Sequence, residues 1–146
     1  MTNREAAMIS KRFDIASDAF RRDFIGKSRA EINAVLGEGR PTRRGALAGE
    51  KGVSYVSVNA RAAFRDGYAV EVGFAPPAPI FFKRQSLFDH PALWREIAAM
   101  DVDTRENLGF LIMPNLGLTL TGFYDNDRSQ LAVTVFEAGR WDDLSA

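Results

Sequence analysis

Three arginines in a glycine-rich stretch, residues 37–52, form the segment best suited to bind an anion. Arg40, Arg43 and Arg44 lie there among five glycines and one proline, a composition that predicts a loop. Guanidinium groups on such a loop can hold a carboxylate or a phosphate. The segment lacks the Gly-Lys-Ser/Thr ending of a phosphate-binding loop, so a solvated basic loop is the alternative to a specific anion site.

Two other short segments carry side chains suited to contacts with another protein. Phe81 and Phe82 follow a proline-rich stretch and are expected to form either a short edge strand or plug, or an exposed apolar patch. A predicted turn places Tyr124 and two aspartates at the surface. With the arginine loop, these segments supply the candidate binding residues: Arg40, Arg43, Arg44, Phe81, Phe82, Tyr124, Asp125 and Asp127.

The chain offers few groups for nucleophilic catalysis, because it has one histidine and no cysteine. A Ser–His–acid mechanism would have to use His90, with Ser86 and Asp89 near it in sequence. Closeness in sequence is not the geometry that this mechanism requires. Asp89 and His90 also directly precede Pro91, which is typical of the capped start of a helix. We therefore expect no catalytic residue.

Two acidic clusters resemble the opening of a calcium-binding loop. They comprise Asp101, Asp103 and Glu106, and Asp125, Asp127 and Ser129. Neither cluster has the central glycine and the closing glutamate at the required positions, and ordinary turn chemistry explains both. The missing cysteines also exclude thiolate zinc and iron–sulfur sites. We expect no metal site and no cofactor.

The elements that must position these residues begin with two N-terminal helices. Apolar residues spaced by three or four positions predict a long amphipathic helix over residues 4–24. Ser28 and Glu31 have the spacing of a capping box and predict a second helix over 29–36, with Gly37 at its end. A third helix is expected from Pro91 to about Met100.

Strands are predicted in two groups on either side of that third helix. The first group covers residues 53–64 and 68–74, joined by an Asp66-Gly67 hairpin turn, with a short candidate at 80–82. The second group covers 110–113, 117–124 and 130–137. Strands joined by hairpins and segregated helices indicate an α+β fold with a mainly antiparallel sheet of five to six strands. The two halves share this outline, although their motifs do not align.

The chain's 146 residues suit one domain, 1–146, and its formal net charge is zero. The first hundred residues hold 16 Lys and Arg against 11 Asp and Glu, whereas the last 46 hold 3 against 8. The fold either mixes these charges or keeps a basic face near Arg40–Arg44 apart from an acidic one near Asp125 and Asp127. Because the charges balance, nucleic-acid binding is disfavoured. The sequence shows neither a signal peptide nor an apolar membrane span, which predicts a cytoplasmic protein without a membrane role.

Residues 26–37, the capped helix start described above, resemble the corresponding segment of the BamE/SmpA and β-lactamase-inhibitor-protein modules. The resemblance implies a helix packed against an antiparallel sheet and a role in binding other proteins. This chain lacks the signal peptide and the lipid-attachment cysteine of BamE, and the resemblance transfers no functional residue.

We expect a non-enzymatic protein-binding module, of the inhibitor or immunity type, that binds another protein or forms a homo-oligomer such as a homodimer. The separated charges and the missing catalytic constellation favour this hypothesis. The alternative is a small-ligand-binding protein or enzyme with a pocket between sheet and helices, where Tyr55, Tyr68, Glu71 and arginine residues would supply polar contacts.

Overall fold

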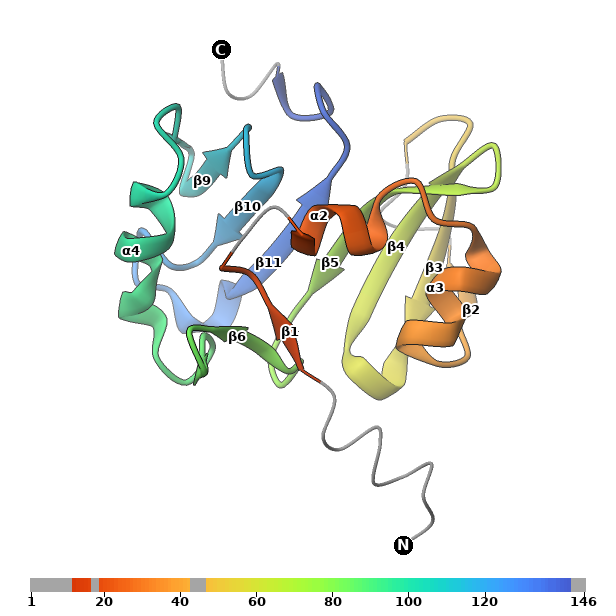
Figure 1. Ribbon diagram of the computed structural model, residues 1–146, viewed down its shortest axis with the longest axis horizontal. Helices are drawn as coiled ribbons and strands as arrows, with labels where there is room; N and C mark the ends of the chain where they lie inside the picture. The colour runs from red at the N-terminus through yellow and green to blue at the C-terminus, as the bar shows by residue number, and fades with distance from the viewer. Residues whose placement is uncertain (1–11, 17–18, 43–46, 143–146) are drawn as a thin grey trace, which may run out of the picture.

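The computed structural model describes residues 12–16, 19–42 and 47–142 (Figure 1). Its helices are α2 (Ala19–Phe24), α3 (Arg29–Leu36) and α4 (Trp94–Ala99), with 3-10 turns η1 (Val56–Val58), η2 (Pro91–Leu93) and η3 (Arg128–Gln130). Its strands are β1 (Phe13–Asp14), β2 (Arg40–Thr42), β3 (Lys51–Tyr55), β4 (Ala60–Arg65), β5 (Tyr68–Phe74), β6 (Ile80–Phe82), β7 (Gln85–Ser86), β8 (Arg105–Asn107), β9 (Phe110–Met113), β10 (Leu118–Thr121) and β11 (Ala132–Phe136).

The strands form a large antiparallel sheet and a small second sheet. The large sheet has eight strands in the order β2-β3-β4-β5-β11-β10-β9-β8, and the small one has three in the order β1-β6-β7. The α+β class and the third helix between two strand groups are confirmed. The predicted five to six strands are too few, because the structure has eleven.

Each half of the large sheet is built from one continuous stretch of chain. Helix α3 precedes the meander β2–β5, and helix α4 precedes the meander β8–β11. The two meanders meet where β5 pairs with β11. The early and late segments of the sequence therefore occupy opposite ends of the sheet (Figure 1). This architecture places the edge strands β2 and β8 at a distance from each other, whereas charges near the β5–β11 junction can meet.

The predicted helix over residues 4–24 is wrong between Phe13 and Ala16, and residues 4–11 lie outside the described part of the chain. Phe13 and Ile15 are buried and Asp14 is exposed, which is the two-residue period of a strand. Strand β1 pairs in parallel with β6. Phe13 and Phe24 belong to different elements, but both side chains pack in the same core, with ring centroids 5.5 Å apart. Their helical spacing in the sequence therefore does not reflect a single helix.

The second helix is confirmed with its caps. The Ser28 hydroxyl accepts a hydrogen bond from the Glu31 amide, and the Glu31 carboxylate accepts one from the Ser28 amide. Gly37, at the C-cap, has a φ of 92°, which a residue without Cβ adopts at little cost. The Asp66-Gly67 turn is also confirmed, with φ of 54° and 85°.

The predicted loop over residues 37–52 is wrong at both of its ends. Arg40–Thr42 forms the edge strand β2, and β3 begins at Lys51. Pro41 fits this edge, since an edge strand has one side without ladder partners. The acidic cluster of Asp101, Asp103 and Glu106, for which turn chemistry is expected, likewise overlaps strand β8, which pairs with β9. Neither β2 nor β8 has the apolar alternation that marks a strand in a sequence.

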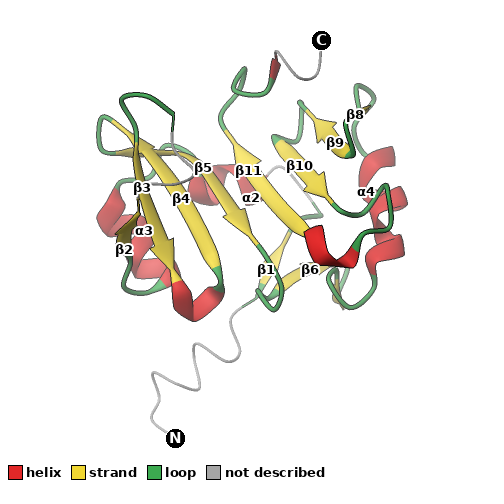
Figure 2. Ribbon diagram, turned by 180° about the vertical axis from the view of Figure 1, so that it is seen from behind, coloured by secondary structure: helices red, strands yellow, loops and turns green. Residues whose placement is uncertain are grey.

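Helices and the small sheet cover one face of the large sheet. Figure 1 shows α2 and α3 in front of the strands, and Figure 2, from behind, shows β3, β4 and β5 with these helices on their far side. Phe20, Phe24 and Phe74 pack between α2 and β5, with ring centroids 5.3 to 5.9 Å apart. We call the other face of the large sheet the open face.

Asp101 fastens the end of α4 to the β9–β10 hairpin. It is 5% exposed, and its carboxylate accepts hydrogen bonds from the amides of Asp103, Asn115 and Leu116 and from the Asn115 side chain. Burial acts to raise the pKa of Asp101, but these hydrogen bonds outweigh it and lower the pKa below its ordinary value. The carboxylate therefore stays ionised and bonded in the folded protein.

We expect the protein to lose stability in acid as Asp101 becomes protonated. A carboxyl whose pKa is lower in the folded than in the unfolded state stabilises the fold above the unfolded pKa, here about 4. That contribution disappears as the pH falls through the folded value. Asp101→Asn should lower the free energy of unfolding at pH 7 by about 2 kcal/mol. Urea midpoints from pH 7 to pH 2.5 should also fall less steeply in this variant, and a decline as steep as the wild type's would contradict the assignment.

Candidate functional site

One residue from each strand of the large sheet lies in a single row across the open face, because directly paired residues share a face. Strand pairing gives this row, from β2 to β8, as Arg40, Ser54, Arg61, Gly73, Thr134, Thr119, Ile112 and Arg105. The flanking residues Val53 and Tyr55 belong to the core under the helices. The side chain of Ser54 therefore points the other way. We call this set the cross-strand row.

The early half of the cross-strand row, which comes from strands β2 to β5, is basic. Arg40 and Arg61 are exposed and lie on either side of Ser54, so their Cα atoms are roughly 10 Å apart at the usual strand spacing. Neither arginine forms an ion pair within the described ranges. These two guanidinium groups are thus available to a partner or ligand.

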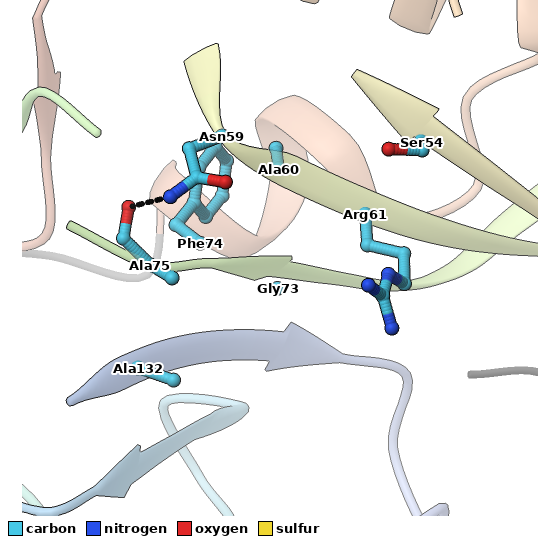
Figure 3. A pocket seen from close by; sticks show the side chains of 8 residues that line it. All are labelled: Ser54, Asn59, Ala60, Arg61, Gly73, Phe74, Ala75 and Ala132. Atoms are coloured by element: carbon cyan, nitrogen blue, oxygen red, sulfur yellow. Dashed lines mark hydrogen bonds between the residues drawn. The ribbon is translucent and has the colours of Figure 1, made fainter. Parts of the chain in front are cut away.

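A shallow hollow of about 310 Å³ lies beside Arg61 on the open face. Its lining consists mostly of small side chains: Ser54, Asn59, Ala60, Arg61, Gly73, Phe74, Ala75 and Ala132. Figure 3 shows the Arg61 side chain reaching from β4 across β5 near Gly73, while the Asn59 amide turns toward the Ala75 carbonyl. The hollow exists because Gly73 and two alanines leave space where larger residues would fill it.

Glu71, a carboxylate on the same face as Gly73, is already engaged. Glu71 lies two residues before Gly73 in β5 and so shares its face. It accepts hydrogen bonds from Arg140 Nε at 3.1 Å and from Trp141 Nε1 at 3.0 Å. These contacts hold Glu71 in an ion pair with Arg140 instead of with Arg61 and leave the basic half of the row uncompensated.

Arg140 also binds Glu50, and this buried pair secures the C-terminal segment. Both guanidinium NH2 groups donate to the Glu50 carboxylate, at 2.6 and 2.7 Å, and the two side chains are 6% and 3% exposed. The hydrogen bonds from Arg140 lower the pKa of Glu50, against the opposing effect of burial. Hydrogen bonds from Glu50 in turn raise the pKa of Arg140 above its ordinary value. Both shifts in pKa favour the charged forms of this pair.

The late half of the cross-strand row is largely covered. Thr119 and Ile112 are buried, and the Thr119 hydroxyl has no hydrogen-bond partner in the described part of the chain. Trp141 packs against Phe110 and Phe136, with ring centroids 5.5 and 5.8 Å apart. The C-terminal segment thus borders the open face with an aromatic ridge formed by these three rings. The exposed members of the row are Arg40 and Arg61 at one end and Arg105 at the other.

The predicted binding turn at Tyr124–Asp127 lies away from the arginines. Tyr124 is 50% exposed and contacts Trp94 at a centroid distance of 5.7 Å, and Asp125 is exposed. Four strands separate β10, which precedes this turn, from β2, which carries Arg40. The predicted binding turn and Arg40 therefore do not share one surface of the sheet.

The remaining predicted binding residues differ in their exposure. Phe82 is fully buried in the core, so it cannot form the exposed apolar patch that was the alternative to a plug. Phe81 is partly buried, with the Arg12 guanidinium 4.7 Å from its ring centroid. Arg43 and Arg44 lie outside the described residues.

The His90 ring contacts the backbone of Ser86. Its Nδ1 lies 3.0 Å from the Ser86 carbonyl oxygen, which requires a hydrogen on that nitrogen. His90 does occupy the N-cap position before Pro91, but its side chain makes no capping hydrogen bond. The expected side-chain cap at this helix start is wrong for His90, and the ring instead closes the turn that follows β7.

The acidic clusters are used in local hydrogen bonds. Asp101 holds the β9–β10 hairpin as described, and Asp127 accepts from both the amide and the hydroxyl of Ser129. Within residues 12–16, 19–42 and 47–142, no three His, Asp or Glu side chains converge as metal ligands. No helix in these ranges is long and apolar enough to cross a bilayer.

Sequence reasoning included Arg40 but missed Arg61, Ser54 and Gly73. Arg61 stands between the buried alanines Ala60 and Ala62, and this alternation is a signal for an outward-facing position. The juxtaposition with Ser54 and Gly73 depends on strand register, which the sequence does not display. Comparison of the chain with protein-family models, with curated proteins and with solved structures finds no match, so its function has to be argued from the open face itself.

Proposed function

We propose that this chain is a non-enzymatic protein-binding module whose open face receives an acidic surface of another protein. The observation that carries the proposal is the basic half of the cross-strand row, where Arg40 and Arg61 flank Ser54 without an ion pair in the described structure. An inhibitor or immunity role in the cytoplasm is the narrower form of this proposal.

The size of the sheet is compatible with a protein partner. Eight strands at about 4.8 Å spacing make it roughly 34 Å wide, although Thr119 and Ile112 in its late half are buried. A standard protein–protein interface buries about 800 Å² on each partner, so a partner would also contact the surfaces that border the basic half. The buried pair of Arg140 and Glu50 keeps the border of this face fixed, so binding requires little ordering of the chain.

Affinity capture with matched charge-reversal variants tests the proposal. Tagged wild-type chain, Arg61→Glu and Arg95→Glu are used to capture proteins from native lysate, and the captured protein is then purified for calorimetry. Arg61→Glu should weaken binding by at least 100-fold, since reversing a charge in an interface leaves like charges opposed. Arg95, an exposed residue of α4 on the helix side, is the matched control and should change the affinity less than threefold.

Two results would reject the open face as the binding surface. One is a partner that binds Arg61→Glu as tightly as wild type, and the other is a partner lost only with Arg95→Glu. If the captured protein is a second copy of the chain, the same variants decide whether self-association uses the open face.

The alternative function, binding of a small ligand, is supported by one feature of the structure, the hollow beside Arg61. The described space between α2 and β5 is filled by phenylalanines, so a ligand pocket there has no room. The hollow beside Arg61 instead offers a small anion a site on the open face.

A further inference from the structure

We infer that the hollow beside Arg61 receives one carboxylate side chain, an aspartate or a glutamate, from the protein partner. This inference rests on the proposed function and names the chemistry of its central contact. It is carried by two adjacent hydrogen-bond donors and the empty volume next to them.

Arg61 and Ser54 form the donor pair. They are directly opposite each other in the β3–β4 ladder, which places their Cβ atoms about 5 Å apart on the same face. Within the described residues, neither the Arg61 guanidinium nor the Ser54 hydroxyl has a hydrogen-bond partner. A planar guanidinium binds a carboxylate through two parallel N–H groups, and a neighbouring hydroxyl can donate a third hydrogen bond.

The other polar groups near the hollow already have hydrogen-bond partners, so Arg61 and Ser54 are the groups that would recognise the carboxylate. The Asn59 side-chain nitrogen already donates to the carbonyl oxygens of Ala75 and Pro76. Glu71, the acidic residue on the same face, is held by Arg140. Arg40 adds a second positive charge beyond Ser54, so an incoming anion meets two cations and no free carboxylate in the described structure.

The dimensions of the hollow favour a side chain over a cofactor. Its volume of about 310 Å³ is at the lower end of the range for small-molecule pockets, roughly 300–1,000 Å³. Gly73, Ala75 and Ala132 are among its lining residues, and the two alanine methyl groups offer apolar contacts to the methylene groups of a glutamate. A free phosphate would use the guanidinium equally well but would leave these apolar groups without a contact.

An NMR titration tests the inference without the partner. The ¹⁵N-labelled chain is titrated with N-acetyl-glutamate methylamide, with the uncharged N-acetyl-glutamine methylamide as the matched ligand, and with inorganic phosphate. The glutamate compound should shift the amides of Ser54, Arg61 and Gly73 with millimolar affinity, at least tenfold more tightly than the glutamine compound. Arg61→Gln should abolish this response, whereas Arg95→Gln should preserve it.

Each contrary outcome has a distinct meaning. Equal responses to the glutamate and glutamine compounds, or an unchanged response in Arg61→Gln, would overturn the carboxylate assignment. Phosphate binding at least tenfold tighter than the glutamate compound would also overturn it, in favour of a free anion. If the titration fails while Arg61→Glu still loses the captured partner, the open face binds that partner without an inserted carboxylate. If the titration succeeds and Arg61→Glu keeps the partner, the proposed function fails and the anion site remains.

Discussion

Arg140→Met is expected to lower the free energy of unfolding by about 3–5 kcal/mol, because it removes both hydrogen-bond donors from a buried carboxylate and leaves it only the more distant Arg65, 3.8 Å away. Glu50 is 3% exposed, and its oxygens accept from both NH2 groups of Arg140. The same substitution releases Glu71 and removes one anchor of the aromatic ridge at Trp141. Urea unfolding followed by circular dichroism measures the loss.

Arg65→Met is the matched control for this prediction. Arg65 belongs to the same ionic cluster: it pairs closely with Glu137 at 2.6 Å and lies 3.8 Å from Glu50, but its side chain is 47% exposed. Its loss should therefore change stability far less than the loss of Arg140. The double variant Arg140→Met with Glu50→Gln should recover part of the stability, since it removes the unpaired charge. Equal losses for Arg140→Met and Arg65→Met would contradict the view that burial makes the Arg140–Glu50 pair important.

Gly122→Ala is expected to lower the free energy of unfolding by about 3–5 kcal/mol, the sum of a backbone term and a packing term. Gly122 has a φ of 84°, which is unfavourable for alanine. An added Cβ would also lie 2.7 Å from the Asp127 carbonyl oxygen and 2.8 Å from the Leu131 amide nitrogen, both of them backbone atoms. The loop that presents Tyr124 closes directly onto this glycine.

Gly26→Ala separates the two terms. Gly26 has the same φ of 84°, but a Cβ there meets nothing within 4 Å. It should cost only the backbone term, about 1–2 kcal/mol. If thermal or urea unfolding gives the same loss for both variants, the close packing at Gly122 does not contribute. A larger loss at Gly122 should also be accompanied by a changed near-ultraviolet signal from Trp94, which Tyr124 contacts.

The sequence predicts those elements whose chemistry is local. The capping box at Ser28 and the Asp66-Gly67 turn each depend on residues within four positions, and both are confirmed. Strands β1, β2 and β8 were missed because pairing partners create them. β1 depends on Ile80, 67 residues away, and β8 is a polar segment that becomes a strand only beside β9.

The candidate site shows the same limit. Arg40 stands out in a sequence because other arginines and glycines surround it. Arg61 stands out only after the register places Ser54 opposite it and Gly73 next to it. The sequence also shows a charge asymmetry without its location. The basic half of the cross-strand row lies in the first meander and the turn at Tyr124–Asp127 lies in the second. They are separated because each half of the sheet is one continuous stretch of chain.

Site-specific photo-crosslinking tests most directly whether the partner protein binds the open face. A p-benzoylphenylalanine is placed at Thr134, which pairs with Gly73 in the cross-strand row, or at Arg95 on the helix side as the control. In native lysate, position 134 should give a covalent adduct with the protein that the wild-type chain captures, and position 95 should give none. An adduct from position 95 alone, or none from position 134 while capture persists, would show that the partner binds elsewhere.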